Sequence, residues 1–181
     1  CVGIFSDDKN KLNNFCRNEN LFLNFIKDFS KKYKVHFIIG SLPFIKSNKK
    51  FLNRSLVINN NGQVIAEYDK INLFNVKLNS KEKYLESKLY DSGKKIKVVS
   101  LPWGKLGLSI CYDIRFPNLY KKLAKNGADF LSIPAAFTKT TGKAHWHSLI
   151  RSRAIENGCF VFAPAQCGIH QNKRETFGHS M

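Results

Sequence analysis

One cysteine in the sequence stands where a sharp turn could make it a nucleophile. Cys111 follows an apolar run at 106–110 and precedes a polar turn, and Pro117 stands where it can open a helix. A cysteine between a buried strand and a helix start would be exposed at the sheet edge. Nearby backbone N–H groups there lower the thiol pKa and can hold an oxyanion. The spacing therefore indicates a sulfur nucleophile, with a packed core cysteine as the alternative.

Two charged residues complete a candidate constellation with this cysteine. Lys70 follows a predicted strand and Glu86 lies in a long polar loop. In an α/β sheet, ligand sites gather at strand ends, so these side chains could meet Cys111 there. A lysine beside a thiol favours the thiolate and can stabilise a negative oxygen. Taken singly, however, Lys70 and Glu86 are each more typical of solvated surface charges.

Histidine offers a second way to activate the thiol. His145 and His147 lie at the start of a predicted helix, and His179 lies near the end of the sequence. His147 adjoins Trp146, which is expected in the core. Helix packing is therefore the favoured interpretation of this pair, and a cysteine–histidine hydrolase is the lesser alternative.

The composition is that of a folded, strongly basic protein. The 181 residues are 43% hydrophobic, fit one domain and carry a formal net charge of +17. The excess charge is nearly all lysine, and no basic run alternates with aromatic residues. This favours a solvated surface over nucleic-acid binding, and the positive field would also attract an anionic small substrate.

The cysteine pattern and the hydropathy bound the expected environment. No apolar run is long enough to span a bilayer, so no membrane partner is expected. The five cysteines show neither a metal-type pairing nor a disulfide framework. We therefore expect no metal and a reducing, cytoplasmic location, with a mitochondrial one left open.

Strands and helices are expected to alternate around these residues, which indicates an α/β fold with a mixed sheet. An Asn-Gly turn at 59–62 predicts a hairpin, and 71–93 reads as a long, functional loop. The strand at 35–40 should be buried on both faces. The remaining strands are expected at 52–58, 63–68, 95–101, 105–111, 129–135 and 159–165, and the helices within 7–34 and at 117–126 and 144–157.

Three stretches resemble the nitrilase (carbon–nitrogen hydrolase) superfamily. They are KLGLSICYDIRFP at 105–117, YDKINLF at 68–74 and GKAHWHSLIRSRAIE at 142–156. The final stretch, 165–181, is similar to the deaminated glutathione amidase branch rather than to the sister ω-amidase branch. The resemblance implies a four-layer α-β-β-α sandwich. It also implies that residues 1–181 form one incomplete domain, truncated at both ends.

The resemblance implies a Glu–Lys–Cys triad. It places the nucleophile at Cys111 and the oxyanion-stabilising lysine at Lys70, and it places an auxiliary glutamate, by a looser match, at Glu86. The backbone N–H of Tyr112 would also hold the oxyanion. The general-base glutamate of the family would stand just before Cys1, so it is expected outside this sequence. The alternative is a complete pseudoenzyme that has lost its base.

The activity implied by the resemblance is hydrolysis of a small keto-acid amide, deaminated glutathione. The reaction would pass through a cysteine thioester, release ammonia and need no cofactor. Lys139, Lys173 and Arg174 are candidates for holding the substrate carboxylates. Two other functions stay open: ω-amidase activity on other keto-acid amides, and a noncatalytic basic binding or scaffold protein.

The resemblance also implies a homodimer. The helices expected at 117–126 and 146–156 match the pairing helices of the family. Arg151, Arg153 and Glu156 are candidates for an interfacial ion network, although a solvated helix face is the default interpretation of such charges.

Overall fold

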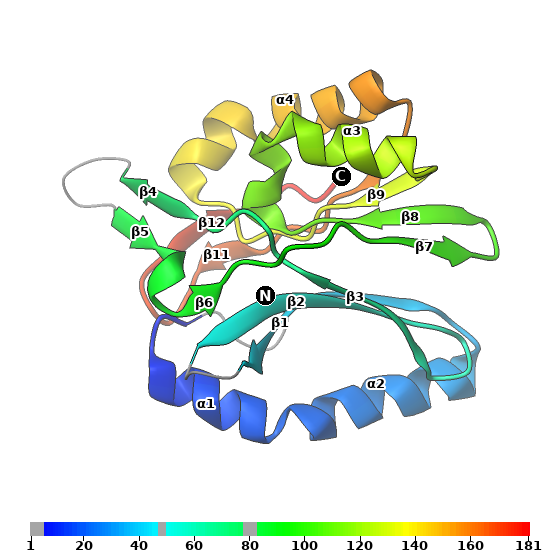
Figure 1. Ribbon diagram of the computed structural model, residues 1–181. Helices are drawn as coiled ribbons and strands as arrows, with labels where there is room; N and C mark the ends of the chain where they lie inside the picture. Colours follow the sequence, from blue (N-terminus) through cyan, green and yellow to red (C-terminus); the bar gives the residue numbers. More distant parts are fainter. Residues whose placement is uncertain (1–5, 47–49, 78–82) are drawn as a thin grey trace.

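Two β-sheets face each other in the protein, and a pair of helices covers the outer face of each (Figure 1). The computed structural model describes residues 6–46, 50–77 and 83–181. This arrangement confirms the expected four-layer α-β-β-α sandwich.

The helices are α1 (Lys9–Arg17), α2 (Glu19–Tyr33), α3 (Pro117–Lys125) and α4 (Lys139–Asn157), with 3₁₀ turns η1 (Glu86–Lys88) and η2 (Cys111–Arg115). The strands are β1 (Phe37–Ile45), β2 (Phe51–Ile58), β3 (Val64–Asp69), β4 (Asn75–Lys77), β5 (Lys83–Leu85), β6 (Tyr90–Asp91), β7 (Val98–Leu101), β8 (Gly104–Leu108), β9 (Phe130–Ser132), β10 (Phe160–Phe162), β11 (Cys167–Ile169) and β12 (Glu175–Phe177).

The first sheet is an antiparallel meander in the order β1-β2-β3, with β6 parallel to β2. The hairpin between β2 and β3 turns at the predicted Asn-Gly step. There the Asn59 side chain accepts hydrogen bonds from the backbone N–H groups of Asn61 and Gln63. Gly62 has a φ of 73°, a conformation that glycine adopts without a Cβ penalty. The hairpin ends at Asp69 and so places Lys70 at the strand end.

The second sheet has the order β10-β9-β8-β7, in which only β7 is antiparallel to its neighbour. Parallel strands need a crossover, and α3 supplies it between β8 and β9 while α4 supplies it between β9 and β10. Both helices therefore lie on the same outer face of this sheet (Figure 1). Cys111 follows β8 at the end where these crossovers begin.

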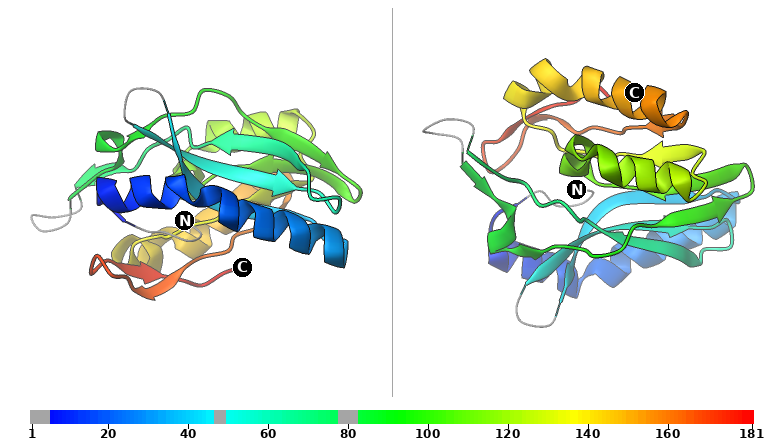
Figure 2. Two further views of the ribbon diagram at one scale, coloured as in Figure 1. Left: turned by 90° about the horizontal axis from the view of Figure 1, so that it is seen from below. Right: turned by 45° about the horizontal axis from the view of Figure 1, so that its top comes forward.

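Apolar side chains fill each interface between layers. Between the sheets, Tyr68 of β3 packs with Leu106 and Leu108 of β8. A second core, with Trp146 of α4 fully buried, lies between α3, α4 and the second sheet. Leu23 of α2 packs on the first sheet, and Figure 2 shows α1 and α2 along its outer face. No helix within the described ranges is long and apolar enough to cross a membrane.

The region expected as a single amphipathic helix with a polar lead-in folds as two helices that meet at Asn18. Phe22 and Ile26 pack against the first sheet as predicted. Leu21 and Phe25 do not, because they are 73% and 63% exposed. Apolar residues surround much of α2, so the sequence pattern alone selects too wide a buried face.

Three other expectations need correction. The loop expected at 71–93 carries the short strands β4, β5 and β6 and the turn η1, while its residues 78–82 lie outside the described part. Helix α4 begins at Lys139 rather than near 144, because the Thr138 side chain caps it. Strand β1 pairs antiparallel with β2, and its Ile38 is 39% exposed rather than buried.

Candidate active site

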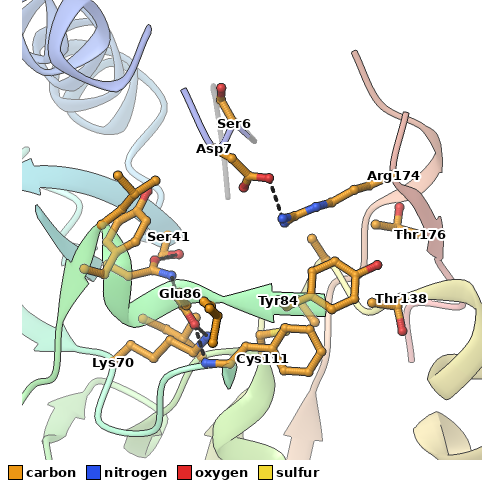
Figure 3. A pocket seen from close by; sticks show the side chains of 18 of the residues that line it. Ser6, Asp7, Ser41, Lys70, Tyr84, Glu86, Cys111, Thr138, Arg174 and Thr176 are labelled. Atoms are coloured by element: carbon orange, nitrogen blue, oxygen red, sulfur yellow. Dashed lines mark hydrogen bonds and ion pairs between the residues drawn. The ribbon is translucent and has the colours of Figure 1, made fainter. Parts of the chain in front are cut away.

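The three residues singled out from the sequence line one cavity. Lys70 follows β3, Glu86 begins η1 and Cys111 begins η2, and all three border a cavity of about 420 Å³ (Figure 3). The first sheet therefore supplies the lysine and the second sheet supplies the cysteine. The long segment after β3 supplies the glutamate. Residues 134–136, which follow β9, form another wall.

Cys111 occupies a sharp turn, as its spacing predicted. Its φ is 50°, a left-handed conformation that costs a non-glycine residue about 1–2 kcal/mol. Its backbone N–H donates to the Pro134 carbonyl at 2.9 Å, which ties the turn to the neighbouring strand end. The helix α3 begins at Pro117 as predicted, and Cys111 itself begins the 3₁₀ turn η2, which precedes that helix. The side chain is half-buried and reaches the cavity.

Lys70 and Glu86 form a buried ion pair. Lys70 Nζ lies 2.6 Å from Glu86 Oε2, and Lys70 is 3% exposed. The same carboxylate accepts hydrogen bonds from the backbone N–H of Phe74 at 2.6 Å and from Asn53 Nδ2 at 3.0 Å. The Ser41 hydroxyl in turn donates to the Asn53 side-chain oxygen. Three donors from separate segments therefore fix the orientation of Glu86.

Asn53 and Ser41 were not predicted as site residues. A signal was present for Asn53, which is a polar residue within the apolar strand β2. Buried polar side chains require hydrogen-bond partners, so such a residue points to a polar centre nearby. Ser41 carries the same signal, because it is the one polar side chain in the strand β1.

Asp113 is a further buried carboxylate that the sequence reasoning missed. It is 0% exposed and accepts hydrogen bonds from the Tyr68 hydroxyl, from the Ile110 backbone N–H and from Asn72. It therefore lies beneath the turn that carries Cys111. Its sequence position two residues after the cysteine was the available signal.

Comparisons with known proteins identify the family of this chain. Residues 15–181 match the family model described as carbon–nitrogen hydrolase. The chain belongs to the carbon–nitrogen hydrolase family. It is 42% identical over 159 residues to a deaminated glutathione amidase of Yersinia enterocolitica, covering 86% of this chain and 56% of that protein. A protein of the same name from Synechocystis is 45% identical over 161 residues, covering 87% and 59%.

Solved structures agree with this carbon–nitrogen hydrolase assignment. The NitFhit protein of Caenorhabditis elegans superposes with a TM-score of 0.93 at 38% identity, over 100% of this chain and 45% of that one. A Saccharomyces cerevisiae protein described as a member of branch 10 of the nitrilase superfamily gives a TM-score of 0.77 at 32% identity, over 88% and 55%. The chain spans just over half the length of the curated relatives named above.

Electrostatics keep the lysine–glutamate pair of this carbon–nitrogen hydrolase ionised. Burial is the largest single effect on Lys70 and disfavours its charge, but the charge and hydrogen bond of Glu86, together with the nearby Cys111 and Asp113, outweigh burial and raise the lysine pKa. Burial is also the largest single effect on Glu86, but the charge and hydrogen bond of Lys70, together with the hydrogen bonds from Phe74 and Asn53, outweigh it and lower the carboxyl pKa. The cavity therefore holds an ammonium whose charge is already partly compensated.

The Cys111 thiol is held in its protonated form. Burial raises its pKa, the nearby Lys70 charge lowers it, and the Glu86 charge raises it, leaving the pKa above the ordinary thiol value. A reaction that uses the thiolate therefore needs a base. Glu86 is a weak one, because its own pKa is lowered by the ion pair.

The histidines are not brought to the cysteine of the carbon–nitrogen hydrolase. His145 Nδ1 lies 3.2 Å from Arg115 Nη2, and His147 packs near the His179 ring. Among the described residues that line the cavity, none is a histidine. The described ranges also contain no group of three or more His, Cys, Asp or Glu side chains arranged as metal ligands. The arrangement thus offers a thiol and an ammonium for chemistry.

The candidate substrate-binding cations are divided between two adjoining cavities. Arg174 lines the main cavity, lies 4.6 Å from the centre of the Tyr84 ring and pairs with Asp7 (Figure 3). Lys139 and Lys173 line only the neighbouring cavity of about 540 Å³. Of the three cations, only Arg174 therefore borders the space that Cys111 reaches.

The charges proposed for a dimer interface include one that acts inside the chain. Arg153 is 5% exposed, and its Nε donates to the Ile114 carbonyl at 2.8 Å while its Nη1 pairs with Glu156 at 2.6 Å. It also lies over the Tyr120 ring. Arg153 thus ties α4 to the turn η2, which corrects its expected place in an interfacial network. Arg151, in contrast, is exposed.

Proposed function

We propose that the full-length protein is a thiol amidohydrolase that cleaves the carboxamide of deaminated glutathione, a small keto-acid amide. The observation that carries the proposal is the shared cavity of Cys111, Lys70 and Glu86, with the cysteine on a left-handed turn. Relatives at 42% and 45% identity bear the name of this activity. The cavity volume of about 420 Å³ falls in the range of small-molecule sites.

The reaction begins with removal of the Cys111 proton. The thiolate then attacks the carboxamide carbon, and the oxygen becomes negative as the tetrahedral intermediate forms. The Lys70 ammonium has three donors and spends one on Glu86 at 2.6 Å, so it has donors left for that oxygen. The backbone N–H of Tyr112, in the first turn of η2, is the second proposed donor.

The second half of the cycle releases the products. The intermediate collapses, the C–N bond breaks and the nitrogen leaves as the amine of cysteinylglycine after taking the proton from the base. The ammonia that the resemblance led us to expect does not form, because the nitrogen of this amide belongs to a peptide bond. Water then loses a proton to the same base and attacks the thioester, which yields the carboxylic acid and restores the Cys111 thiol. The chain's own groups thus supply the nucleophile and the oxyanion donors.

The general base belongs, in this proposal, to a carboxylate of the full-length protein outside these 181 residues. Support comes from the pKa values at the site. The raised Cys111 pKa requires a base, and the lowered Glu86 pKa together with its three hydrogen-bond donors makes it unsuited to that role. Glu86 acts instead on Lys70 by keeping it charged and oriented.

Arg174 is the proposed contact for a substrate carboxylate, because it borders the main cavity. Lys139 and Lys173 would contribute positive potential from the adjoining cavity rather than direct contact near the thiol. Lys139 is also engaged with Glu175 at 2.6 Å. A small dicarboxylate would therefore be oriented with an anionic end toward Arg174.

The decisive test is replacement of the nucleophile in the full-length protein. Cys111→Ala should abolish release of cysteinylglycine from deaminated glutathione, because no thioester can form. Cys159→Ala is the matched control, since its buried thiol donates to the Ala128 carbonyl and lies outside the cavity lining. Full release of cysteinylglycine by Cys111→Ala would refute the assignment. Faster hydrolysis of other keto-acid amides than of deaminated glutathione would favour the ω-amidase alternative.

We also propose that the protein forms a homodimer through α3 and α4. These helices pack side by side on one outer face (Figure 2). Ile155 of α4 is 80% exposed. Because interface cores are enriched in apolar side chains and depleted of charged ones, Ile155 is the side chain that we place at the centre of the interface.

A further inference from the structure

The Asp113 carboxylate forms four hydrogen bonds from a fully buried position. Its Oδ2 accepts from the Tyr68 hydroxyl at 2.7 Å and from the Ile110 backbone N–H at 2.9 Å. Its Oδ1 accepts from both the backbone N–H and the side-chain amide of Asn72, each at 2.9 Å. Every bond links Asp113 to a segment that carries a candidate catalytic group.

The partners of Asp113 bracket both reacting residues. Tyr68 and Asn72 lie two positions before and after Lys70, while Ile110 immediately precedes Cys111. Lys70 leaves the first sheet and Cys111 leaves the second. One carboxylate thus joins the two strand ends across the interface between the sheets.

The Cys111 turn needs such support. Its left-handed φ of 50° is unfavourable for a side chain with a Cβ and persists only where neighbouring contacts hold it. Asp113 supplies two contacts to the residue before the cysteine, because its side chain accepts from the Ile110 N–H and its own N–H donates to the Ile110 carbonyl at 3.1 Å. Asp113 therefore holds the residue before Cys111 with both its side chain and its backbone.

We propose that Asp113 is a positioning residue that holds the Lys70 ammonium and the Cys111 thiol in reacting geometry. The inference rests on the proposed amidase function and deepens it, because Asp113 acts through Lys70 and Cys111 and is not among the residues that line the cavity. Misplacement of a catalytic group by about 1 Å can cost roughly 100-fold in rate.

The chemistry of the site favours a carboxylate over its isosteric amide. All four hydrogen bonds are donated to Asp113, so both oxygens must accept. In Asp113→Asn, one oxygen becomes an NH₂ group that faces either the Ile110 N–H or the Asn72 donors. The hydrogen bonds from the segment of Cys111 or from the segment of Lys70 are then lost, although the volume of the side chain is unchanged.

The test uses the full-length protein with Asp113→Asn and the milder Tyr68→Phe. Tyr68→Phe removes one of the four hydrogen bonds to Asp113, together with the bond that the Tyr68 hydroxyl accepts from the Ile71 N–H at 3.3 Å, and it keeps the Asp113 charge. For Asp113→Asn we expect kcat to fall about 100-fold with KM changed less than about threefold, and for Tyr68→Phe a fall of about tenfold. Leu123→Ala is the control, because it removes a buried contact of α3 that is not part of the cavity lining. The kinetics of the control and of each variant are compared at denaturant concentrations that give both proteins the same folded fraction, so that a difference in kcat does not come from unfolding.

Alkylation of Cys111 by iodoacetamide gives a second readout that does not need amidase turnover. Displacement of Lys70 from the thiol should move the midpoint of the alkylation pH profile upward in both variants. Loss of the Asp113 charge alone would not move it upward, because removing a nearby negative charge favours the thiolate.

The outcomes separate this inference from the proposed function. An upward midpoint in both variants supports positioning, even if the wild-type protein does not hydrolyse deaminated glutathione and the amidase proposal fails. An unchanged or lower midpoint in both variants overturns it. If the wild type is active, two kinetic results also overturn the inference. One is a fall in kcat by the same factor in Asp113→Asn and Leu123→Ala at equal folded fraction. The other is a rise in KM alone in Asp113→Asn.

Discussion

The reactivity of Cys111 depends on one charge. Burial raises the pKa of this thiol, and Lys70 provides the principal opposing effect. Lys70 is itself buried and remains charged because Glu86 faces it at 2.6 Å. Lysine, glutamate and cysteine therefore form one electrostatic unit, in which a change to any member alters the other two.

Replacement of Lys70 by Met tests this coupling. Removing the ammonium takes away the principal effect that opposes burial, so the Cys111 pKa rises and the midpoint of its alkylation pH profile moves to higher pH. Hydrolysis of deaminated glutathione should slow about 100–1,000-fold, because an oxyanion donor is lost. Iodoacetamide kinetics across pH and steady-state assays of the full-length protein provide the measurements.

Lys46→Met is the matched control for this charge loss. Lys46 also pairs with a carboxylate, Asp91, at 3.1 Å, but it is not part of the cavity lining. It should change neither the alkylation midpoint nor kcat. An unaltered midpoint in Lys70→Met would contradict the assigned role of the ammonium.

At the scale of elements, the hairpin between β2 and β3 determines where Lys70 emerges. Its turn requires glycine for two reasons: Gly62 has a φ of 73°, and a Cβ there would lie 2.6 Å from the Lys27 carbonyl oxygen of α2. The turn and the helix are thus in close contact. Gly158 after α4 shares only the first property, because a Cβ there would meet nothing within 4 Å.

These two glycines provide a paired prediction for stability. Gly158→Ala should lower the free energy of unfolding by about 1 kcal/mol, from the left-handed conformation alone. Gly62→Ala should cost about 2–3 kcal/mol, because the backbone contact with α2 must also shift. Urea unfolding of the full-length variants measures both, and equal losses would show that the contact with α2 does not matter.

On the scale of the whole molecule, the proposed dimer can be broken at one position. Ile155→Asp would bury an unpaired charge in the interface and should weaken dimerisation about 100-fold. Ile45→Asp is the control, because Ile45 is also exposed, at 56%, but lies on β1 in the opposite half of the sandwich. Sedimentation velocity distinguishes dimer from monomer. A dimer retained by Ile155→Asp at low concentration would place the interface elsewhere.

The sequence by itself determined the order of the central strands and of the helices α3 and α4, and the positions of the chemistry. Apolar periodicity and turn residues predict the hairpin, the strand before Cys111 and the helix after it, because these signals come from neighbours along the chain. The turn chemistry also predicts a sharp bend at the cysteine, which its φ of 50° confirms. The family resemblance placed Lys70 and Glu86 with it.

Only the tertiary structure decided which side chains meet. Asp113 reaches Tyr68 across 45 positions of sequence, and Asn53 reaches Glu86 across 33. No local pattern encodes such pairs, because the first forms only when the two sheets pack face to face and the second only when the segment after β3 folds back beside β2. The same holds for Arg153, which has the spacing of a surface charge on α4 but is buried by the turn η2. Periodicity along a chain specifies faces of elements, whereas packing between layers specifies the site.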